Sequence, residues 1–543
     1  MPVIPRLLGG LAFAAGLLVA HGATFHVDPL RGDDAASGLS DVTAWRSLER
    51  ARKVALSPGD RLLLIAGVRH RGSLQFDSLS GSADAPIIIG SYVRAGDNEQ
   101  ATAMIDGRNA AAAIRLRNCR QVRVENLVLT ADGGTPQGEM RCGVLVEFDR
   151  EGEYQGITLT RLLVKSVSFE NPGHVRPEID VKTPNGRARY GWGVRFIVDP
   201  AVKAVLRDIR VTDSVIERVD HTGLKFTAPA DGIRDVSVEN VRVSQTGGPG
   251  IQMSGVTGGR FARLSVDHSG STSDTRNWGR GSGLWTWNTR DVVIERSRFT
   301  HANGPGDSAG VHIDYHCRNV VVQYNYSAHN AGGFCEILGD NHNCAYRYNI
   351  SVNDGHRVKG REGAFQEGKL FWLSGYVGPG RKPTGPFNSY FYNNTLYVDA
   401  TIEAKFTVAA SAEGVLVANN IFHIVGRSRR VASDQSKAEQ AETKTVPRAV
   451  VSHNLFLRTD TWPPGLGMSD PSPLVGDAAF LRPGGDHPAD YLPGNRERVQ
   501  DRGSVPTLLP GDTIGLTVGL AVTEDILGRP IRGAPDLGAI ELP

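Results

Sequence analysis

Short segments that start with glycine and then alternate apolar and polar residues recur along the middle of the chain. They read GLKFT at 223, GIQMS at 250, GLWTW at 283, GVHID at 310 and GFCEI at 333, with starts 27, 33, 27 and 23 residues apart. GVLVE at 143 and GVRFI at 193 fit the same frame. Alternation with a period of two is typical of a β-strand that buries one face. The pattern therefore predicts one such strand per repeat.

A second series of short strands turns at asparagine and shares this rhythm. VENLVL and RYNISV are two of its members, and loops such as SQTGGPG or HANGPGD lead on to the next glycine segment. One unit is a strand, an asparagine turn, a strand, a glycine-rich turn and a strand, in roughly 22 to 30 residues. The asparagines of the series are Asn126, Asn240, Asn325, Asn349, Asn394, Asn420 and Asn454.

A unit of this length is typical of one coil of a parallel β-helix. Its strands stack on the equivalent strands of the next coil about 4.8 Å away, and asparagines at one turn can hydrogen-bond along the stack. Repeats that could not fold alone then share one continuous core. We expect an all-β solenoid over residues 88–460, with Asn325 and Asn349 stacked on adjacent coils. The alternative is a β-sandwich with coincidental asparagine turns.

The two ends of the chain lack the repeat. The apolar run from Leu7 to Ala20, preceded by Arg6, predicts a secretory signal peptide at 1–23, because it is shorter than the roughly 20 residues that span a bilayer. An uncleaved membrane anchor is the alternative. We expect residues 24–87 to cap the solenoid and residues 461–543 to form an irregular C-terminal segment packed on it. The mature protein is then secreted or periplasmic, with no membrane span.

Composition narrows the class of partner. The formal net charge is +2, whereas a nucleic-acid-binding protein has a clear basic excess, so we expect no nucleic acid. The five cysteines are an odd number, and we expect them to be buried and unpaired, with a Cys335–Cys344 disulfide as the alternative. We expect a monomer.

Both ends of the mature chain resemble those of a known class of proteins. The lead-in FHVDPLRGDDAASGLSDVTAWRSLERARKVALSPGDRLLLIAGV and the closing EDILGRPIRGAPDLGAIEL are similar to segments of secreted bacterial right-handed parallel β-helix proteins that act on polysaccharides, the pectate-lyase-like superfamily. The resemblance covers nearly the whole mature chain. It implies a right-handed solenoid and a polysaccharide-degrading enzyme. It does not specify the reaction, since this fold hosts lyases, hydrolases, epimerases and binding proteins.

Alternation assigns a face to each position of the glycine segments. The second residues, which are expected to face the core, are Leu224, Ile251, Leu284, Val311 and Phe334. The third and fifth residues, which are expected to face solvent, include Lys225, Gln252, Trp285, Trp287, His312 and Asp314, with Arg195 on an earlier coil. Exposed tryptophans beside His, Asp and Lys indicate a groove in which sugar rings stack on indoles. The alternative is that the long loop SVDHSGSTSDTRNWGRGSG covers both tryptophans.

β-Elimination on a uronic-acid polysaccharide is the first of two chemistries that fit this groove, and the one we expect. It needs a base, for which Lys225 and His312 are candidates, and positive charge on the substrate carboxylate, which Arg195 can supply. GLKF resembles the strand of family 9 pectate lyases that carries their catalytic lysine, which implies that Lys225 is its counterpart. Those enzymes hold calcium with several aspartates. Calcium is therefore the one cofactor that the resemblance suggests, although the nearby carboxylates, Glu147, Asp149, Asp199 and Asp220, form no clear aspartate cluster.

Hydrolysis is the second chemistry, and it needs two carboxylates, one as acid and one as base or nucleophile. Candidates are Asp307, Asp314, Glu336 and Asp340. In this register Glu336 takes a core-facing position, where an ionised carboxylate is costly, so we expect it to be protonated or its strand to be irregular. A register error of one residue is the alternative.

A non-catalytic carbohydrate-binding solenoid is the third class, and the crowding of titratable residues on a few coils argues against it. We place the catalytic centre between Asp307 and Asp340, with Asp314 as the strongest candidate because most equivalent positions are uncharged. The catalytic candidates are Asp314, His312, Lys225, Glu336 and Asp307, and the substrate-binding candidates are Trp285, Trp287, Gln252, Arg195, His316, Asp340 and Arg361. We expect no transition metal, because His312 and His316 lie about 13 Å apart on a straight strand.

Overall fold

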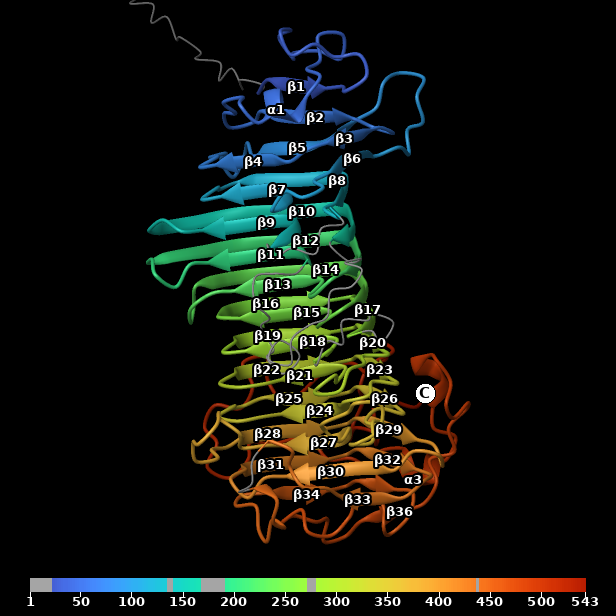
Figure 1. Ribbon diagram of the computed structural model, residues 1–543. Helices are drawn as coiled ribbons and strands as arrows, with labels where there is room; N and C mark the ends of the chain where they lie inside the picture. The colour runs from blue at the N-terminus through green and yellow to red at the C-terminus, as the bar shows by residue number, and fades with distance from the viewer. Residues whose placement is uncertain (1–21, 134–139, 168–190, 271–279, 436–438) are drawn as a thin grey trace, which may run out of the picture.

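The chain folds into an elongated stack of coils, and its C-terminal segment lies beside this stack (Figure 1). The computed structural model describes residues 22–133, 140–167, 191–270, 280–435 and 439–543. The expected signal peptide therefore lies almost wholly outside the described residues. Within them, no helix is long and apolar enough to cross a bilayer.

The predicted stacked parallel strands are present, and they are arranged in two sheets that form the walls of the solenoid. The front sheet, which faces the viewer in Figure 1, has 12 strands in the described part of the chain. Each strand pairs in parallel with its equivalent on the next coil, as β13 does with β15 and β15 with β18. In chain order the front strands are β4 (Leu74–Asp77), β7 (Ala112–Arg117), β9 (Arg141–Phe148), β11 (Gly191–Val198), β13 (Leu224–Thr227), β15 (Ile251–Ser254), β18 (Leu284–Trp287), β21 (Val311–Ile313), β24 (Gly333–Ile337), β27 (Lys369–Leu373), β30 (Ala404–Val408) and β33 (Ser428–Arg430).

The larger sheet has 24 strands among the described residues and forms the rest of each coil. The chain bends within this sheet. Helices are confined to α1 (Leu48–Ala51), α3 (Arg496–Val499) and the 3-10 helix η2 (Pro488–Tyr491) in the described ranges. The strands of the larger sheet are β1 (Thr24–Val27), β2 (Arg61–Ile65), β3 (Arg69–Arg71), β5 (Ile87–Tyr92), β6 (Ala103–Asp106), β8 (Val122–Thr130), β10 (Gly152–Val167), β12 (Ala204–Val219), β14 (Ile233–Thr246), β16 (Val256–Ala262), β17 (Ser265–Ser269), β19 (Arg290–Glu295), β20 (Arg298–Thr300), β22 (Arg318–Gln323), β23 (Tyr326–Ala328), β25 (Ala345–Arg347), β26 (Ile350–Val352), β28 (Phe387–Tyr392), β29 (Thr395–Val398), β31 (Glu413–Ala418), β32 (Ile421–Ile424), β34 (Val450–Ser452), β35 (Leu455–Phe456) and β36 (Leu474–Val475).

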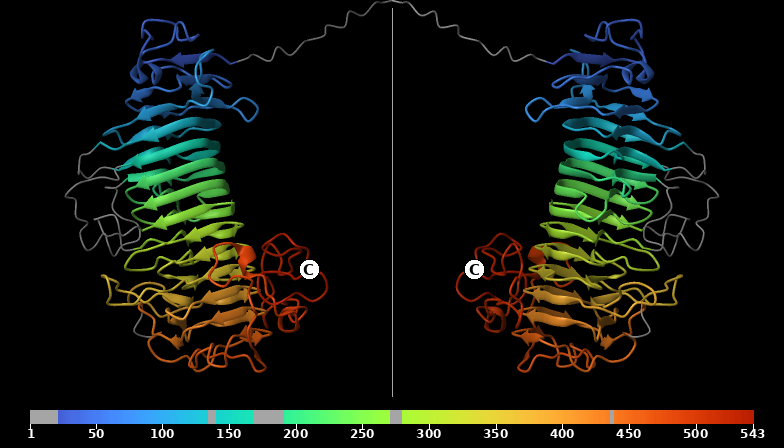
Figure 2. Two further views of the ribbon diagram at one scale, coloured as in Figure 1. Left: turned by 90° about the vertical axis from the view of Figure 1, so that its right-hand side faces the viewer. Right: turned by 90° about the vertical axis from the view of Figure 1, so that its left-hand side faces the viewer.

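Strand pairing extends further at both ends than the expected solenoid of residues 88–460. The segment expected to be only a cap already contributes β1 and β2, which pair in parallel with each other, and β2 pairs with β5. At the other end β36 pairs with β35. The last residues then run back along the outside of the stack (Figure 2). There Leu509 and Leu516 pack on Tyr390 and Tyr392 of β28, so this segment covers the larger sheet.

The core is one continuous apolar column inside the coils. The predicted second positions Leu224, Ile251, Leu284 and Val311 stand level with one another on successive strands and are buried. All five cysteines are buried and free, as expected, and the Cys335–Cys344 disulfide is not formed. Burying one aliphatic side chain of this size contributes roughly 1.5 to 3 kcal/mol, so a stack of them holds the coils together.

An asparagine ladder runs through five coils of the larger sheet. From Asn325 through Asn349, Asn394 and Asn420 to Asn454, each side-chain amide donates to the next Oδ1 at 3.1, 3.0, 3.1 and 2.9 Å. Each Oδ1 also accepts the backbone N–H of the previous asparagine. The predicted stacking of Asn325 on Asn349 is confirmed.

Asn126 and Asn240 do not belong to this ladder. Both are exposed and have a positive φ, of 56° and 54°. Tyr348, which directly precedes the ladder residue Asn349, has a φ of 53°. The two asparagines therefore occupy the left-handed turn position one residue before the ladder, which asparagine tolerates well.

We expect Asn349→Ala to destabilise the protein by roughly 2 to 6 kcal/mol. The substitution leaves the buried N–H of Asn325 and the carbonyl of Val322 without partners, and each unsatisfied buried group costs about 1 to 3 kcal/mol. Thermal unfolding followed by circular dichroism measures the loss. Asn126→Gly is the control, because glycine accepts the positive φ at that exposed turn. Equal melting temperatures for the two variants would contradict a stabilising ladder.

Candidate functional site

The third positions of the glycine segments form one column on the outside of the front sheet. Arg195, Lys225, Gln252, Trp285 and His312 stand level on consecutive strands from β11 to β21. The predicted column is therefore confirmed. The prediction that it faces solvent is wrong, because the relative exposure of Lys225, Gln252, Trp285 and His312 is 5% or less.

Glu336 belongs to this outward column, and its predicted core-facing position is wrong. β24 pairs with β21 through Ile337 and Ile313, so Glu336 stands level with His312 and Cys335 takes the core position level with Val311. The glycine segment GFCEI is thus displaced by one residue relative to the other four. Glu336 is nevertheless 1% exposed, so it is a buried carboxyl outside the apolar core.

A segment at 355–368, here called the strap, is bound to the loop before β21. The Arg357 guanidinium donates to the carbonyls of Gly304 and Asp307 at 3.0 and 2.8 Å and to that of Gln366 at 2.9 Å. The Gln366 Oε1 accepts the backbone N–H of Asp307 at 2.6 Å. These bonds tie the strap to the loop that carries Asp307.

Asp307 is a fully buried carboxylate paired with Arg280. The Arg280 Nη1 lies 2.5 Å from Asp307 Oδ2. Burial opposes ionisation, yet the charge of Arg280 and its hydrogen bond keep the pKa of Asp307 below its usual value. Asp307 and Ser308 are consecutive non-glycine residues with φ of 43° and 68°. Left-handed backbone at two such residues is strained, and strain of this kind gathers at functional sites.

Asp314 directly follows β21, the strand that the Asp307 loop leads into, and its pKa is shifted in the opposite direction. Its Oδ2 accepts a hydrogen bond of 2.9 Å from the Trp285 indole Nε1. Burial and the negative charge of Asp307 raise the pKa of Asp314 to about 7. The Trp285 ring stacks on His312, with centroids 5.1 Å apart and 10° between the planes. Trp285 is thus a buried positioning group, and the prediction that it is an exposed sugar platform is wrong.

His312 and Glu336 form a second buried pair. The His312 Nδ1 lies 3.4 Å from Glu336 Oε2, and within the described part of the chain neither side chain has a hydrogen-bond partner. Burial lowers the pKa of His312 to about 4, and burial together with Asp307 raises the pKa of Glu336 to about 8. Both groups are therefore neutral near neutral pH.

The site therefore holds an ionised carboxylate beside carboxyls that keep their protons. Asp307 is the ionised group because Arg280 compensates its charge, whereas Asp314 and Glu336 have no cation as close among the described residues. Carboxyl groups whose environments push their pKa values apart can act as an acid and a base in one reaction. The arrangement is suited to acid–base chemistry.

The remaining predicted residues are distributed around this centre. Trp287 stands level with Asp314 on the adjacent strand, is 38% exposed and lies 5.2 Å from the Tyr315 ring. His316 and Asp340 pair with each other, Nδ1 to Oδ2, at 2.5 Å. Arg361 is exposed in the strap.

Lys225 and Arg195 lie two and three coils away from Trp285 along the column. Burial and the positive charge of Arg195 lower the pKa of Lys225 well below its usual value. Arg195 itself lies over the Trp192 ring, 4.2 Å from the centroid. These two basic residues are thus adjacent to each other in the column rather than to Asp314.

Two of the carboxylates near the expected calcium position are engaged by arginines. Arg115 donates to Glu147 at 2.7 Å, and Arg117 donates to Asp149 at 2.8 Å. Both carboxylates are thus compensated by cations in neighbouring positions. A calcium requirement stays a prediction.

Three residues of the site were not predicted from the sequence. Arg280 and Lys369 are charged side chains beside glycine-rich turns, and Trp372 of β27 stands level with Glu336. Lys369 Nζ lies 2.9 Å from Asp434 Oδ2 and 3.9 Å from the Trp372 ring centroid. No periodic signal marks Arg280 or Lys369. Trp372 could have been found by extending the outward column one coil further.

Comparison with known proteins supports the fold. Residues 205–372 match the family described as a right handed beta helix region. A lacto-N-biosidase of Bifidobacterium longum subsp. longum is 24% identical, and the alignment covers 96% of this chain and 36% of that protein. The chain therefore spans little more than a third of the length of this curated relative.

Two solved structures are also similar. The GH136 lacto-N-biosidase from Eubacterium ramulus has a TM-score of 0.50 at 16% identity, over 84% of this chain and 68% of that one. The protein XylC, solved with xylose, has a TM-score of 0.50 at 10% identity, over 96% and 98%. At these identities the likeness concerns the fold alone. It supports the right-handed parallel β-helix expected from the sequence.

We expect Glu336→Gln to stabilise the protein at alkaline pH and to leave it unchanged at acidic pH. The pKa of Glu336 is raised from 4.5 to about 8, so the folded state holds a proton that the unfolded chain releases above pH 4.5. Stability is therefore lost progressively as pH rises through that window, by about 1.4 kcal/mol for each pH unit between the two pKa values. Glutamine stays neutral and avoids the loss.

Melting temperatures at about pH 4 and about pH 9 test this dependence. The Glu336→Gln variant should melt several degrees higher than the parent protein at the alkaline pH and at the same temperature at the acidic pH. Glu99→Gln, at an exposed position, serves as the control and should show no such difference. If the melting temperature of Glu336→Gln differed from that of the parent protein by the same amount at every pH, Glu336 would not be a buried neutral acid.

Proposed function

We propose that this protein is a glycoside hydrolase that cleaves an oligosaccharide or polysaccharide at the front sheet, with Asp314 as general acid and Asp307 as the second carboxylate. The observation that carries the proposal is the split between the two pKa values, with Asp307 held ionised by Arg280 and Asp314 raised to about 7. The match to a lacto-N-biosidase along most of this chain supports hydrolysis of a glycosidic bond.

In this mechanism the protonated Asp314 donates its proton to the glycosidic oxygen of the leaving group. Asp307, as the anion, either attacks the anomeric carbon or activates a water molecule, which are the two roles open to the second carboxylate of a glycosidase. The Trp285 indole holds Asp314 by its Oδ2. Arg280 keeps Asp307 free of a proton.

The exposed Trp287 and the half-buried Tyr315 supply a binding platform beside this acid. Trp287 stands level with Asp314 on the neighbouring strand, so a sugar ring stacked on the indole brings its glycosidic oxygen near the carboxyl. Aromatic faces with a few convergent polar groups are typical of carbohydrate sites. We propose that the substrate is extracellular, in keeping with the predicted signal peptide.

β-Elimination by Lys225 is the second candidate function, and one observation favours it. The lowered pKa of Lys225 favours the neutral amine, which is the form that can act as a base. Because the acid–base groups with separated pKa values gather around Asp307 instead, hydrolysis takes precedence over the lyase expected from the sequence.

One assay separates the two reactions. The purified protein is incubated with a panel of neutral and uronic oligosaccharides, and both new reducing ends and ultraviolet absorbance are followed. New reducing ends without absorbance support hydrolysis. Absorbance from an unsaturated product identifies elimination and overturns the proposal, as does sugar binding without any cleavage.

We expect Asp314→Asn and Asp307→Asn each to reduce turnover by about 100-fold or more, because each removes one of the two groups that move protons or attack. Asparagine keeps the size of the side chain, so the melting temperature should change little at Asp314. Asp291→Asn, at an exposed carboxylate of β19, serves as the control. Near-normal turnover by Asp314→Asn on a confirmed substrate would remove Asp314 from the mechanism.

We expect kcat/KM to fall as pH rises through about 7, because the general acid must hold its proton and the pKa of Asp314 lies there. Trp285→Phe should move this alkaline limb to higher pH by about one to two units. The indole hydrogen bond stabilises the carboxylate anion of Asp314, so its loss raises the pKa of Asp314. As a bond to a charged group it is worth about 1.5 to 3 kcal/mol.

The control for this pH profile is Trp287→Phe, which keeps an aromatic ring beside Asp314 without touching its carboxyl. It should raise KM and leave the alkaline limb in place. A limb that moves to lower pH in Trp285→Phe, or does not move, would rule out Asp314 as the titrating acid.

A further inference from the structure

A row of histidines lies on the outside of the solenoid, away from Asp314. His268 stands at the end of β17, His301 follows β20 and His329 follows β23, so they occupy equivalent turns of three coils. Their φ angles of 52°, 55° and 55° show the same left-handed backbone at each turn. Ring centroids lie 4.7 Å apart for His268 and His301 and 5.5 Å apart for His301 and His329.

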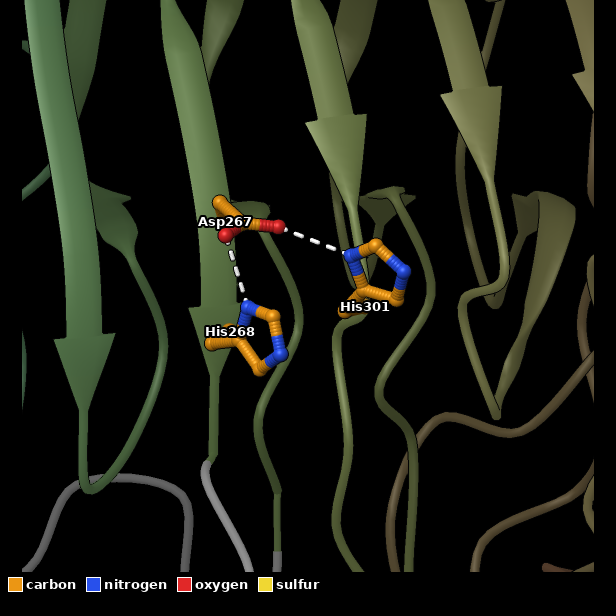
Figure 3. A group of neighbouring side chains, drawn as sticks. All are labelled: Asp267, His268 and His301. Atoms are coloured by element: carbon orange, nitrogen blue, oxygen red, sulfur yellow. Dashed lines mark hydrogen bonds and ion pairs between the residues drawn. The ribbon is translucent and has the colours of Figure 1, made fainter. Parts of the chain in front are cut away.

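Asp267 orients two of these imidazoles. Its Oδ2 lies 2.6 Å from Nδ1 of His268, and its Oδ1 lies 2.8 Å from Nδ1 of His301 (Figure 3). Thr300 donates to the same Oδ1 at 2.6 Å and fixes the carboxylate. Each Nδ1 therefore carries the hydrogen that Asp267 accepts, which leaves Nε2 of both rings with a free lone pair.

This is the arrangement in which histidine binds metal in proteins. A metal-binding imidazole almost always donates its other ring N–H to a carboxylate, a carbonyl or a water molecule, which sets the tautomer and the direction of the ring. In the row, one carboxylate does this for two neighbouring rings. One possible ligand atom from each of Asp267, His268 and His301 lies within 4.8 Å of the other two.

The row also has space for a ligand. His268, His301, His329 and His356 line an open pocket of about 560 Å³ together with Ala302, Asn303 and Ile402. His268 and His301 are half-exposed, with side-chain exposures of 54% and 46%. The buried asparagine ladder stabilises the coils through bonds within the protein, whereas these rings keep one nitrogen each for a partner from solvent.

We propose that the row binds one divalent transition-metal ion of the zinc type through the Nε2 atoms of His268 and His301, with Asp267 as the carboxylate that orients both rings. Zinc–nitrogen bonds are about 2 Å long, so two nitrogens on one ion stand at most about 4 Å apart. The centroids of the two rings lie 4.7 Å apart and their planes differ by 23°, so both rings must turn toward each other for their Nε2 atoms to reach one ion. His329 and His356 border the same pocket and supply further imidazoles.

The proposed site is separate from the proposed acid–base centre, although the two are linked by one loop. His301 begins the connection 301–308 that leads to Asp307. An ion on His268 and His301 would join two coils at the start of that loop. The ligands of the ion are the imidazoles of the row. Binding of the ion therefore does not depend on which reaction the front sheet performs.

Titration of tag-free, chelator-stripped protein with Zn²⁺ and Co²⁺ tests the proposal. Calorimetry should show one tight site per chain, and Co²⁺ should give the visible absorption of a low-symmetry site with nitrogen ligands. His301→Asn should weaken binding by about 100-fold or more, since it removes one of two principal ligands. Asp267→Asn should weaken it by about 10- to 100-fold, as expected for a carboxylate that orients a ligand.

The controls are matched to the fold. Asn353 follows β26 with a φ of 55°, so asparagine is native to this row and His301→Asn preserves the turn. His453→Asn replaces an exposed histidine with a φ of 56° elsewhere on the solenoid and should leave affinity unchanged. The proposal is overturned if the parent protein binds no ion more tightly than the His301→Asn variant does. It is also overturned if Asp307→Asn rather than His301→Asn abolishes binding.

Discussion

The parallel register between coils is the constraint on which the rest of the structure depends. When each strand pairs residue for residue with the next coil, a side chain inherits the inward or outward direction of the residue below it. This is how Lys225, Gln252, Trp285 and His312 come to share one column. The asparagine ladder holds the same register in the larger sheet, because a slip of one residue would break every bond in it.

The one-residue displacement at β24 has chemical consequences for the site. It turns Glu336 out of the core and places it level with His312, where two buried polar groups face each other. Cys335 fills the core position instead and keeps the apolar column continuous. A carboxyl in the core would have been neutral and inert, whereas in the outward column it joins Asp307 and Asp314 in one electrostatic environment.

The strap and Arg280 set the electrostatic environment of the proposed acid–base centre. Burial raises the pKa of any carboxyl, and the contacts of Arg357 and Gln366 exclude water from the loop around Asp307. One arginine next to Asp307 then suffices to separate two otherwise similar aspartates. The same loop begins at His301, so the proposed acid–base centre and the proposed metal row are two ends of one connection.

The sequence by itself determined the fold class, the coil repeat, the stacked asparagines and the column that holds the candidate residues, because hydrophobic period and turn chemistry are local properties that repeat. It also singled out Asp314 and Asp307. Only the tertiary structure decided which column residues are buried, where β24 shifts, and which carboxyl is ionised. The burial and ionisation of Asp307 depend on Arg280, Arg357 and Gln366, which approach from other coils and whose positions no local period encodes.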